Sequence, residues 1–280
     1  MNPFSLSDII RNALAEDLGD GDHSALSCIP ENARSKAKLL VKEPGIIAGL
    51  EVAKMVAHEV DPTLSINLLK KDGEWVNSGE IAFFIEGNSR SLLSAERIIL
   101  NLMQRMSGIA TQTHRITQLI SHTKCRVLDT RKTVPGLRAF DKWAVKIGGG
   151  VNHRFGLFDM IMIKDNHADY AGGLANAIQN CKNYLQKTGK DLLIEVETRN
   201  LEEIDIALQA GGIHRIMFDN FDFETMKKAV QRVNGLCETE ASGGITEENV
   251  VQFAETGVDF VSMGCLTHTV RNLDLSLKAV

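Results

Sequence analysis

The spacing of apolar and polar residues divides the chain into two stretches with different rhythms. Over roughly the first hundred residues, strand-like alternation and helical periodicity follow each other irregularly, and Pro44-Gly45 and Asp72-Gly73 mark turns. This pattern predicts a small mixed α/β domain, in which Gly108 separates two helices as a hinge. The predicted helices are Ser7–Leu18, Val52–Val60, Leu92–Met106 and Ala110–Ser121, and the predicted strands lie within Ser35–Ala48, Leu64–Leu69 and Ile81–Ile85.

From Cys125 onward, short apolar runs alternate regularly with helical stretches. The predicted strands are Val127-Leu128, Met160–Ile163, Leu192–Val196, Arg215–Phe218, Cys237–Ala241 and Phe260–Met263. The predicted helices are Arg138–Ile147, Leu174–Lys187, Leu201–Ala210, Phe223–Val233 and Glu247–Glu255. Strand alternating with helix predicts a parallel sheet with right-handed crossovers. The later strands recur about every 22 residues, which favours a barrel over an open sheet, although the pattern offers too few strands for a full eight-stranded barrel.

Composition places the chain among ordinary soluble globular proteins. Apolar residues make up 44% and charged residues 24% of its 280 residues. The start of the chain lacks the basic and apolar regions of a signal peptide, and no apolar run approaches the roughly 18 residues that span a bilayer. The five cysteines are scattered without a Cys-x-x-Cys pair, which favours reduced thiols. We therefore expect a cytoplasmic protein without a membrane partner.

Charge is distributed unevenly. The net charge of −5 argues against a general nucleic-acid binder. Yet Lys124–Asp165 holds nine Lys or Arg and four Asp or Glu, a net +5, which leaves −10 on the rest of the chain. A basic island in an acidic protein can draw a small anion to one place, although a solvated helix face with lysines would look similar.

Polar or glycine residues follow the apolar runs of the second stretch. In parallel α/β barrels, the carboxyl ends of the strands carry the chemistry. The candidates by this criterion are Asp129-Thr130-Arg131-Lys132-Thr133, Lys164-Asp165-Asn166-His167, Glu195 with Glu197, Asp219-Asn220, Ser242-Gly243-Gly244, and Gly264 with His268. Together they offer cations, carboxylates and a glycine turn without a nucleophile beside a base, so acyl transfer is not indicated.

Individual candidates keep structural alternatives. Arg131 and Lys132 could be surface loop charges. Lys164 directly follows an apolar run, so its stem must be partly buried, and such a lysine needs an anionic partner. Glu195 and Glu197 are two apart and share one face of a strand, where either could serve a hydrated Mg²⁺ or ribose hydroxyls with Asp219. Glu195 could instead be the structural partner of a basic side chain.

Two glycine-rich segments suggest close backbone approach to a ligand. Ser242-Gly243-Gly244 precedes the helix predicted near Glu247, an arrangement that suits phosphate. Gly148-Gly149-Gly150 leads directly to His153-Arg154. A flexible linker is the simple explanation, but we favour a loop held against substrate.

These segments resemble quinolinate phosphoribosyltransferases over nearly the whole chain, in order. The matching motifs are Glu16-Asp17-Leu18-Gly19, Glu96-Arg97-x-x-Leu100-Asn101, Leu128-Asp129-Thr130-Arg131-Lys132-Thr133, Gly148-Gly149-Gly150-x-Asn152-His153-Arg154, Ile163-Lys164-Asp165-Asn166-His167, Glu195-Val196-Glu197, Asp219-Asn220-Phe221, Glu240-Ala241-Ser242-Gly243-Gly244-Ile245 and Leu266-Thr267-His268. The spacing between Glu197 and Asp219 is one residue longer than the family pattern, near Gly211-Gly212.

The resemblance implies a fold, an assembly and a reaction. It implies an N-terminal α/β sandwich over residues 1–108 and an incomplete barrel of about seven strands over 109–269, with 270–280 expected to pack back on the first domain. It implies a homodimer or hexamer of dimers with shared active sites. The implied reaction joins quinolinate to phosphoribosyl pyrophosphate with Mg²⁺ and yields nicotinate mononucleotide, pyrophosphate and carbon dioxide, a step of de novo NAD biosynthesis.

The resemblance also implies residue roles. Arg131, His153 and Arg154 would grip the quinolinate carboxylates, helped by Arg97 of the neighbouring subunit, while Lys132 and Lys164 would lie between quinolinate and pyrophosphate. Glu197 and Asp219 would serve ribose and metal. The remaining implied substrate-binding residues are Thr130, Thr133, Ser242, Gly243, Gly244 and Gly264.

Three other functions remain open from the sequence. A nicotinate phosphoribosyltransferase would act on a mono-acid, against which a grip for two carboxylates argues. A Schiff-base lyase would use Lys164 or Lys132 as the amine. A non-catalytic binding module would bind anions without turnover.

Overall fold

A computed structural model describes residues 5–280, and its contacts divide the chain into two compact units. The first unit contains the chain up to His114, together with Thr133–Gly149 and Leu266–Val280; the second contains Arg115–Lys132 and Gly150–Cys265. The prediction about a signal peptide lies partly in residues 1–4, outside the described residues. Within residues 5–280, no helix combines the length and apolarity needed to cross a membrane.

The first unit is built around an antiparallel sheet with the strand order β12-β1-β5-β3. These strands are β1 (Arg34–Val41), β3 (Ser65–Leu68), β5 (Ile81–Asn88) and β12 (Leu275–Ala279), and a separate pair is formed by β2 (Gly45–Ile46) and β4 (Trp75–Val76). The helices of this part are α1 (Leu6–Leu18), α2 (His23–Cys28) and α3 (Leu50–Val60). Alternate residues of β1 and β5 are fully buried, among them Leu39, Phe83 and Ile85, and form its core.

One long helix replaces the two predicted around Gly108. Helix α4 runs without a break over Ser89–Leu119, so the hinge prediction was wrong. A Cβ atom on Gly108 would lie 2.3 Å from the carbonyl oxygen of Arg271. Gly108 is therefore needed for close approach of the C-terminal segment, and this packing outweighs the low helix propensity of glycine.

The last strand returns to the first sheet. Strand β12 pairs antiparallel with β1, with Leu39 opposite Leu277. The later segments of the first unit contain two helices, α5 (Arg138–Ile147) and α11 (Cys265–His268). In α5, the fully buried Asp141 accepts two hydrogen bonds from Arg105, at 2.7 and 2.8 Å, which fixes this helix to α4.

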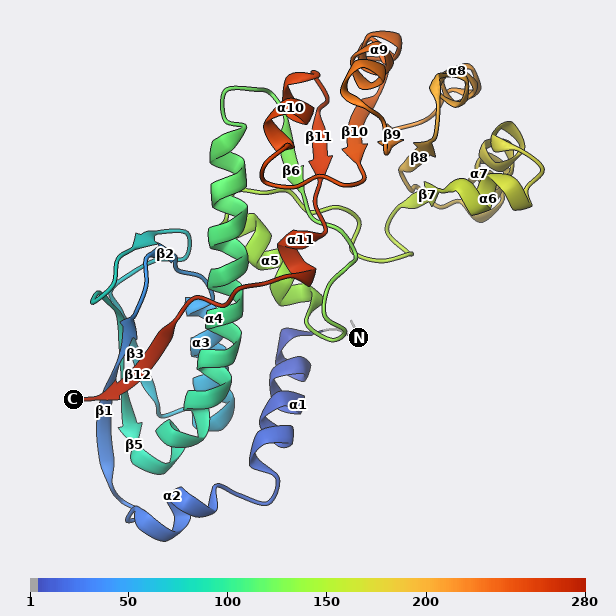
Figure 1. Ribbon diagram of the computed structural model, residues 1–280. Helices are drawn as coiled ribbons and strands as arrows, with labels where there is room; N and C mark the ends of the chain where they lie inside the picture. Colours follow the sequence, from blue (N-terminus) through green and yellow to red (C-terminus); the bar gives the residue numbers. More distant parts are fainter. Residues whose placement is uncertain (1–4) are drawn as a thin grey trace. The chain divides into compact units, whose positions relative to one another are not determined.

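The second unit contains a six-stranded parallel sheet with the order β6-β11-β10-β9-β8-β7. Its strands are β6 (Arg126–Leu128), β7 (Ile161–Ile163), β8 (Ile194–Thr198), β9 (Arg215–Asp219), β10 (Glu238–Ser242) and β11 (Phe260–Ser262). Helices α6 (Asp165–Tyr170), α7 (Leu174–Thr188), α8 (Leu201–Ala210), α9 (Phe223–Val233) and α10 (Val250–Glu255) connect them, with α7, α8 and α9 along one side of the strands (Figure 1). This is the predicted alternation of strand and helix.

The barrel is incomplete. Strands β6 and β7 occupy the two ends of the strand order, and in the described part of the chain they do not pair with each other. Val151 forms a single parallel bridge to Leu128, so the seventh strand of the predicted barrel is reduced here to one residue. Apolar residues at the strand centres, such as Val127, Val196 and Ile216, are buried and provide the barrel core.

The predicted boundaries shift where charged residues continue a strand. Strand β8 begins and ends two residues later than predicted, because Glu195 and Glu197 belong to its ladder opposite Arg215 and Met217. Helix α10 begins at Val250, after a turn, rather than at Glu247.

Candidate active site

All but two of the predicted site residues lie in the second unit, at one edge of its sheet. Thr130, Arg131 and Lys132 follow β6, His153 and Arg154 follow the Val151 bridge, and Lys164 follows β7. Glu197 is the next-to-last residue of β8, Asp219 ends β9, Ser242 ends β10 before Gly243 and Gly244, and Gly264 follows β11. Parallel strands bring these carboxyl ends to a common edge.

The other two residues belong to the first unit. Arg97 lies on α4, is exposed, and has no carboxylate within ion-pair distance among residues 5–280. Thr133 accepts a hydrogen bond from Arg138 Nε at 3.1 Å, which links it to the start of α5. The contacts of one chain therefore assign Arg97 and Thr133 to a different compact unit from the remaining candidates.

Lys164 and Glu197 form an ion pair at the sheet edge. Lys164 Nζ lies 2.5 Å from Glu197 Oε2. The lysine side chain is 44% exposed and the glutamate side chain 9%. Lys164 is thus half-buried with an anionic partner, as its position after an apolar run predicted. An incoming anion can reach its ammonium from the solvent side.

The turn after β10 is shaped by close backbone contacts. Asn220 N–H donates to the Ser242 carbonyl at 2.9 Å, and a Cβ atom on Gly243 would lie 2.2 Å from Asn220 Oδ1. Gly243 and Gly244 both have positive φ, 97° and 61°. Only glycine fits Gly243 without displacing Asn220, and the turn presents backbone rather than side chains to the edge.

Gly148, the first of the three consecutive glycines, has a packing role within the first unit. A Cβ atom there would lie 2.5 Å from the Ala110 carbonyl oxygen on α4. Its nearest neighbours are thus protein atoms, so packing against α4 explains this glycine.

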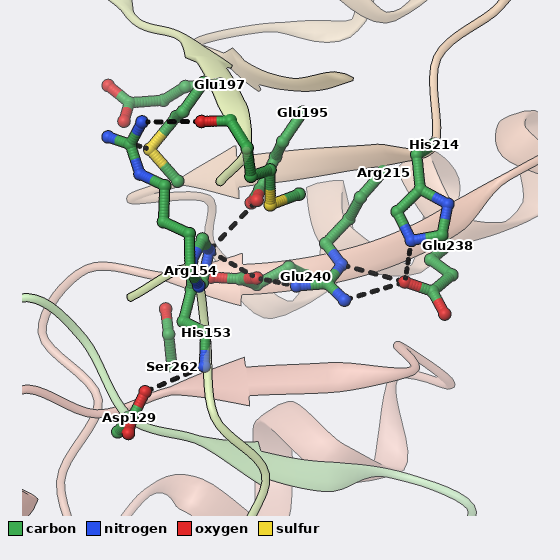
Figure 2. A network of polar contacts seen from close by, with 12 residues as sticks. Asp129, His153, Arg154, Glu195, Glu197, His214, Arg215, Glu238, Glu240 and Ser262 are labelled. Atoms are coloured by element: carbon green, nitrogen blue, oxygen red, sulfur yellow. Dashed lines mark hydrogen bonds and ion pairs between the residues drawn. The ribbon is translucent and has the colours of Figure 1, made fainter. Parts of the chain in front are cut away.

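His153 is the centre of a buried network that joins three strands (Figure 2). Its Nε2 lies 3.0 Å from Glu195 Oε2 and 3.5 Å from Glu240 Oε2, and both carboxylates are fully buried. Glu240 also receives Arg215 Nη1 at 3.0 Å, and Arg215 reaches Glu238 at 2.7 Å. The structural role considered for Glu195 is therefore confirmed: it partners a basic side chain.

Both ring nitrogens of His153 face protein groups. Burial alone would lower its pKa, but contact with Glu195 and Glu240 raises the pKa of His153 to about 9. At the same time its Nδ1 accepts a hydrogen bond from the Arg154 amide at 2.7 Å. A proton on Nδ1 would point at that N–H. The hydrogen bond therefore opposes the imidazolium form, which has protons on both ring nitrogens and which the carboxylates favour. It places the proton of the ring on Nε2.

The carboxylates of this network have pKa values displaced in opposite directions. Burial and the neighbouring Glu240 raise the pKa of Glu195. Burial would also raise the pKa of Glu240, but His153 and Arg215 hold it below its ordinary value. Glu240 is therefore the anion that balances Arg215.

Arg154 extends from this network toward the edge. Its guanidinium donates to the Met160 carbonyl at 3.2 Å and contacts Met162 Sδ at 3.6 Å. Burial and the nearby Arg131 lower the pKa of Arg154. An exposed guanidinium that repels a partly buried one forms a site that an anion would stabilise.

The loop after Arg154 is held by Asp159. Its carboxylate accepts hydrogen bonds from the amides of Phe155 and Gly156, at 2.6 and 2.9 Å. At the other side of His153, Asp129 Oδ1 accepts the His153 amide at 2.8 Å. His153 and Arg154 are thus fixed by backbone as well as side-chain contacts.

Carboxylates at the edge could share a metal ion with a substrate. Glu197 is paired with Lys164, and Asp219 accepts a hydrogen bond from Asn220 Nδ2 at 2.9 Å. Within the described chain, the only group of three or more potential ligands is His153, Glu195 and Glu240, whose buried charges already balance with Arg215. Glu197 and Asp219 suit Mg²⁺ only as two ligands completed by phosphate and water, which is its usual mode of binding.

Sequence reasoning did not assign roles to Arg215 and Glu240. A signal was present, because Glu238 and Glu240 alternate in an otherwise apolar-and-threonine run, and Arg215 begins the preceding strand run. Charged residues with a spacing of two inside neighbouring strands indicate a buried pair, and in the sheet Arg215 lies opposite Glu238.

Comparisons with known proteins match both parts of the chain. The family described as quinolinate phosphoribosyl transferase, N-terminal domain, matches residues 22–107, and the corresponding C-terminal domain matches residues 109–278. A chloroplastic nicotinate-nucleotide pyrophosphorylase (carboxylating) of Arabidopsis thaliana is 46% identical over 290 residues, which cover 98% of this chain and 83% of the relative. A probable enzyme of the same name from Bacillus subtilis is 41% identical, with 99% and 94% covered.

A solved structure agrees with these sequence relatives. The nicotinate-nucleotide pyrophosphorylase of Francisella tularensis has a TM-score of 0.92 and 39% sequence identity, and the match covers 98% of this chain and 96% of that one. Two domain matches that span nearly the whole chain, and relatives well above 30% identity, lead to one conclusion: the chain belongs to the quinolinate phosphoribosyltransferase family.

Proposed function

We propose that this protein transfers the phosphoribosyl group of phosphoribosyl pyrophosphate to quinolinate, with loss of carbon dioxide, to give nicotinate mononucleotide and pyrophosphate. This is the decarboxylating pentosyl transfer that brings quinolinate into NAD biosynthesis. One observation carries the proposal beyond family membership. The cations Arg131, Arg154 and Lys164 lie at the same sheet edge as the Gly243-Gly244 turn and two carboxylates.

Arg131 and Arg154 would bind the two quinolinate carboxylates. Guanidinium groups bind carboxylates through paired hydrogen bonds, and an anion here would relieve their mutual repulsion. Thr130 supports the same loop, because its Oγ1 accepts the Lys132 amide at 3.0 Å. Thr133 is assigned a substrate role only through the family motif. His153 serves this grip by holding the backbone of Arg154.

The remaining edge residues suit the phosphoribosyl half of the reaction. As pyrophosphate departs, positive charge develops on the ribose, where Glu197 and Asp219 can stabilise it. Lys132 and Lys164 can balance the charge on the departing anion. The 5-phosphate would meet backbone amides at the ends of β10 and β11, where the residues are Ser242, Gly243, Gly244 and Gly264. The positively charged pyridine nitrogen then stabilises the electrons left when carbon dioxide is lost.

Mg²⁺ would be held by Glu197 and Asp219, and it would supply positive charge that offsets the charge of the phosphates. Because Glu197 already pairs with Lys164, the two cations would share one carboxylate. Glu195 is not assigned to this metal, since its only ion-pair partner within residues 5–280 is the buried His153.

A homodimer, or a hexamer of dimers, would complete each site with Arg97 of the neighbouring subunit. Arg97 is exposed on α4, and Leu93 on the preceding turn of the same helix face is 43% exposed. An exposed leucine beside an exposed arginine suits a surface that a second chain covers. We further propose a cytoplasmic location, in keeping with scattered cysteines that form no disulfide in the described chain.

The direct test is a reaction assay with the purified protein. Quinolinate should be consumed only when phosphoribosyl pyrophosphate and Mg²⁺ are both present, with pyrophosphate and carbon dioxide released in equal amounts. Omission of Mg²⁺ tests the metal proposal separately. Turnover of an aldehyde or ketone substrate that borohydride traps on Lys164 or Lys132 would instead indicate a Schiff-base lyase, and anion binding without turnover would indicate a binding module.

A further inference from the structure

The network around His153 extends through the interior of the second unit to residues that have no assigned role in the reaction. From the site edge it contains Arg154, the buried His153, Glu240 and Arg215, and then Glu238, whose side chain is 37% exposed (Figure 2). Glu240 is fully buried and the Arg215 side chain is 10% exposed. Ionised groups are rarely kept at such depth unless their arrangement is needed.

Two basic partners, Arg215 and His153, constrain the Glu240 carboxylate from different sides. Arg215 Nη1 approaches Oε2 at 3.0 Å from one side, while His153 Nε2 lies 3.5 Å from the same oxygen. Arg215 is itself held by Glu238 through Nε at 3.1 Å and Nη2 at 2.7 Å, and its guanidinium stacks 4.3 Å from the Phe260 ring centroid. Arg215 is therefore rigid, and it fixes the carboxylate that faces His153.

His153 passes this constraint to Arg154 through the backbone. Its Nδ1 can accept the Arg154 N–H at 2.7 Å only while that nitrogen carries no proton. Carboxylates at Nε2 stabilise this tautomer, since they require a proton on Nε2. If the carboxylates were lost, the ring could turn or change tautomer, and the Arg154 amide would lose its acceptor.

We propose that Glu240, fixed by Arg215, is a positioning residue for recognition of the pyridine dicarboxylate. It acts through His153 on Arg154, and it touches no substrate itself. The inference rests on the proposed function, because it assigns Arg154 to a carboxylate of quinolinate. It predicts a selective loss on the quinolinate side. The Gly243-Gly244 turn follows Glu240 on the same strand, but its backbone is held by Asn220 rather than by the Glu240 side chain, and Lys164 follows another strand.

The test compares Glu240→Gln with the matched variant Glu238→Gln. Both replace a carboxylate that holds Arg215 with an amide of equal size, but Glu238 does not contact His153 and its side chain is 37% exposed. With Glu240→Gln, the KM for quinolinate should rise on the order of tenfold or more, whereas the KM for phosphoribosyl pyrophosphate should change less than about threefold. Glu238→Gln should leave both KM values within about twofold of wild type.

A second variant separates positioning from general stability. Arg215→Met with Glu240→Gln removes both buried charges while it keeps side-chain volume, so it should fold even if Glu240→Gln alone does not. Its quinolinate KM should remain raised, because His153 keeps Glu195 but still lacks the carboxylate of Glu240. ¹⁵N spectra of the histidines should show His153 as the Nε2–H tautomer in wild type and a mixture in this variant.

The outcomes distinguish the inference from the function. No quinolinate turnover by wild-type protein would overturn the proposed function. Normal wild-type turnover, with equal rises in both KM values or an unchanged His153 tautomer in the folded variants, would overturn the positioning role and leave the function intact.

Discussion

Two acid–base pairs lie two residues apart on strand β8 and behave differently. Glu195 faces His153 and is fully buried, while Glu197 faces Lys164, whose side chain is 44% exposed. The inner pair is enclosed by protein, and Glu240 and Arg215 complete its charge balance. The outer pair borders solvent, where a substrate anion can replace the carboxylate as the partner of Lys164. Position along one strand therefore separates a permanent contact from an exchangeable one.

The inner pair, His153 with Glu195, should matter mainly for stability. The largest effect that we expect is on the free energy of unfolding, which should fall more at the inner pair than at the outer pair. Glu195→Ala leaves His153 without its closest carboxylate and opens a cavity, so it should lower the free energy of unfolding by about 3–5 kcal/mol. Glu197→Ala, the same change at the outer pair, should cost less than about 1 kcal/mol. Denaturant unfolding of the two variants measures both values. Equal losses would remove the distinction between the pairs.

The outer lysine should matter mainly for turnover. Lys164→Met keeps most of the stem volume and should fold, but it removes the cation that we propose balances the departing pyrophosphate. We expect kcat to fall on the order of 10²–10³-fold, the usual result of removing one charge-stabilising donor. Lys187→Met, at an exposed lysine in the last turn of α7, is the control. Full activity of Lys164→Met would exclude Lys164 from the reaction.

Arg97, which lies in the first unit, should have a smaller effect on activity than Lys164. We expect it to act on the active site of the partner chain. Loss of Arg97 removes one charged grip on a carboxylate, so quinolinate affinity should fall roughly ten- to a hundred-fold, or about 1.5–3 kcal/mol. At quinolinate concentrations well below the wild-type KM, Arg97→Ala and Lys164→Ala proteins should each show low activity. After subunit exchange in an equal mixture, activity should return to about one quarter of wild type, because half of the dimers are mixed and each has one intact site.

Verified exchange without recovery would place Arg97 in the site of its own chain, or outside any site. The contacts of one chain already assign Arg97 and Thr133 to a different unit from the other candidates. The mixing experiment therefore tests the shared-site proposal independently of the reaction chemistry.

The sequence predicted which residues follow the carboxyl ends of the parallel strands. It did so because such strands place these ends together whatever their detailed boundaries. It also identified Glu195 as a possible partner of a basic side chain. It failed at Gly108, where glycine is required by the approaching Arg271 carbonyl rather than by a break in the helix. It did not identify the pairing of Arg215 with Glu240, because such pairs depend on which strands are neighbours, and strand order is a property of the fold.

The central claim is that the edge recognises two carboxylates on one pyridine ring. The most direct measurement compares kcat/KM for quinolinate and for nicotinate, which lacks the second carboxylate, under identical phosphoribosyl pyrophosphate and Mg²⁺. Loss of one charged grip corresponds to roughly ten- to a hundred-fold in affinity, so quinolinate should be preferred by at least that factor. Equal values for the two acids would contradict the account.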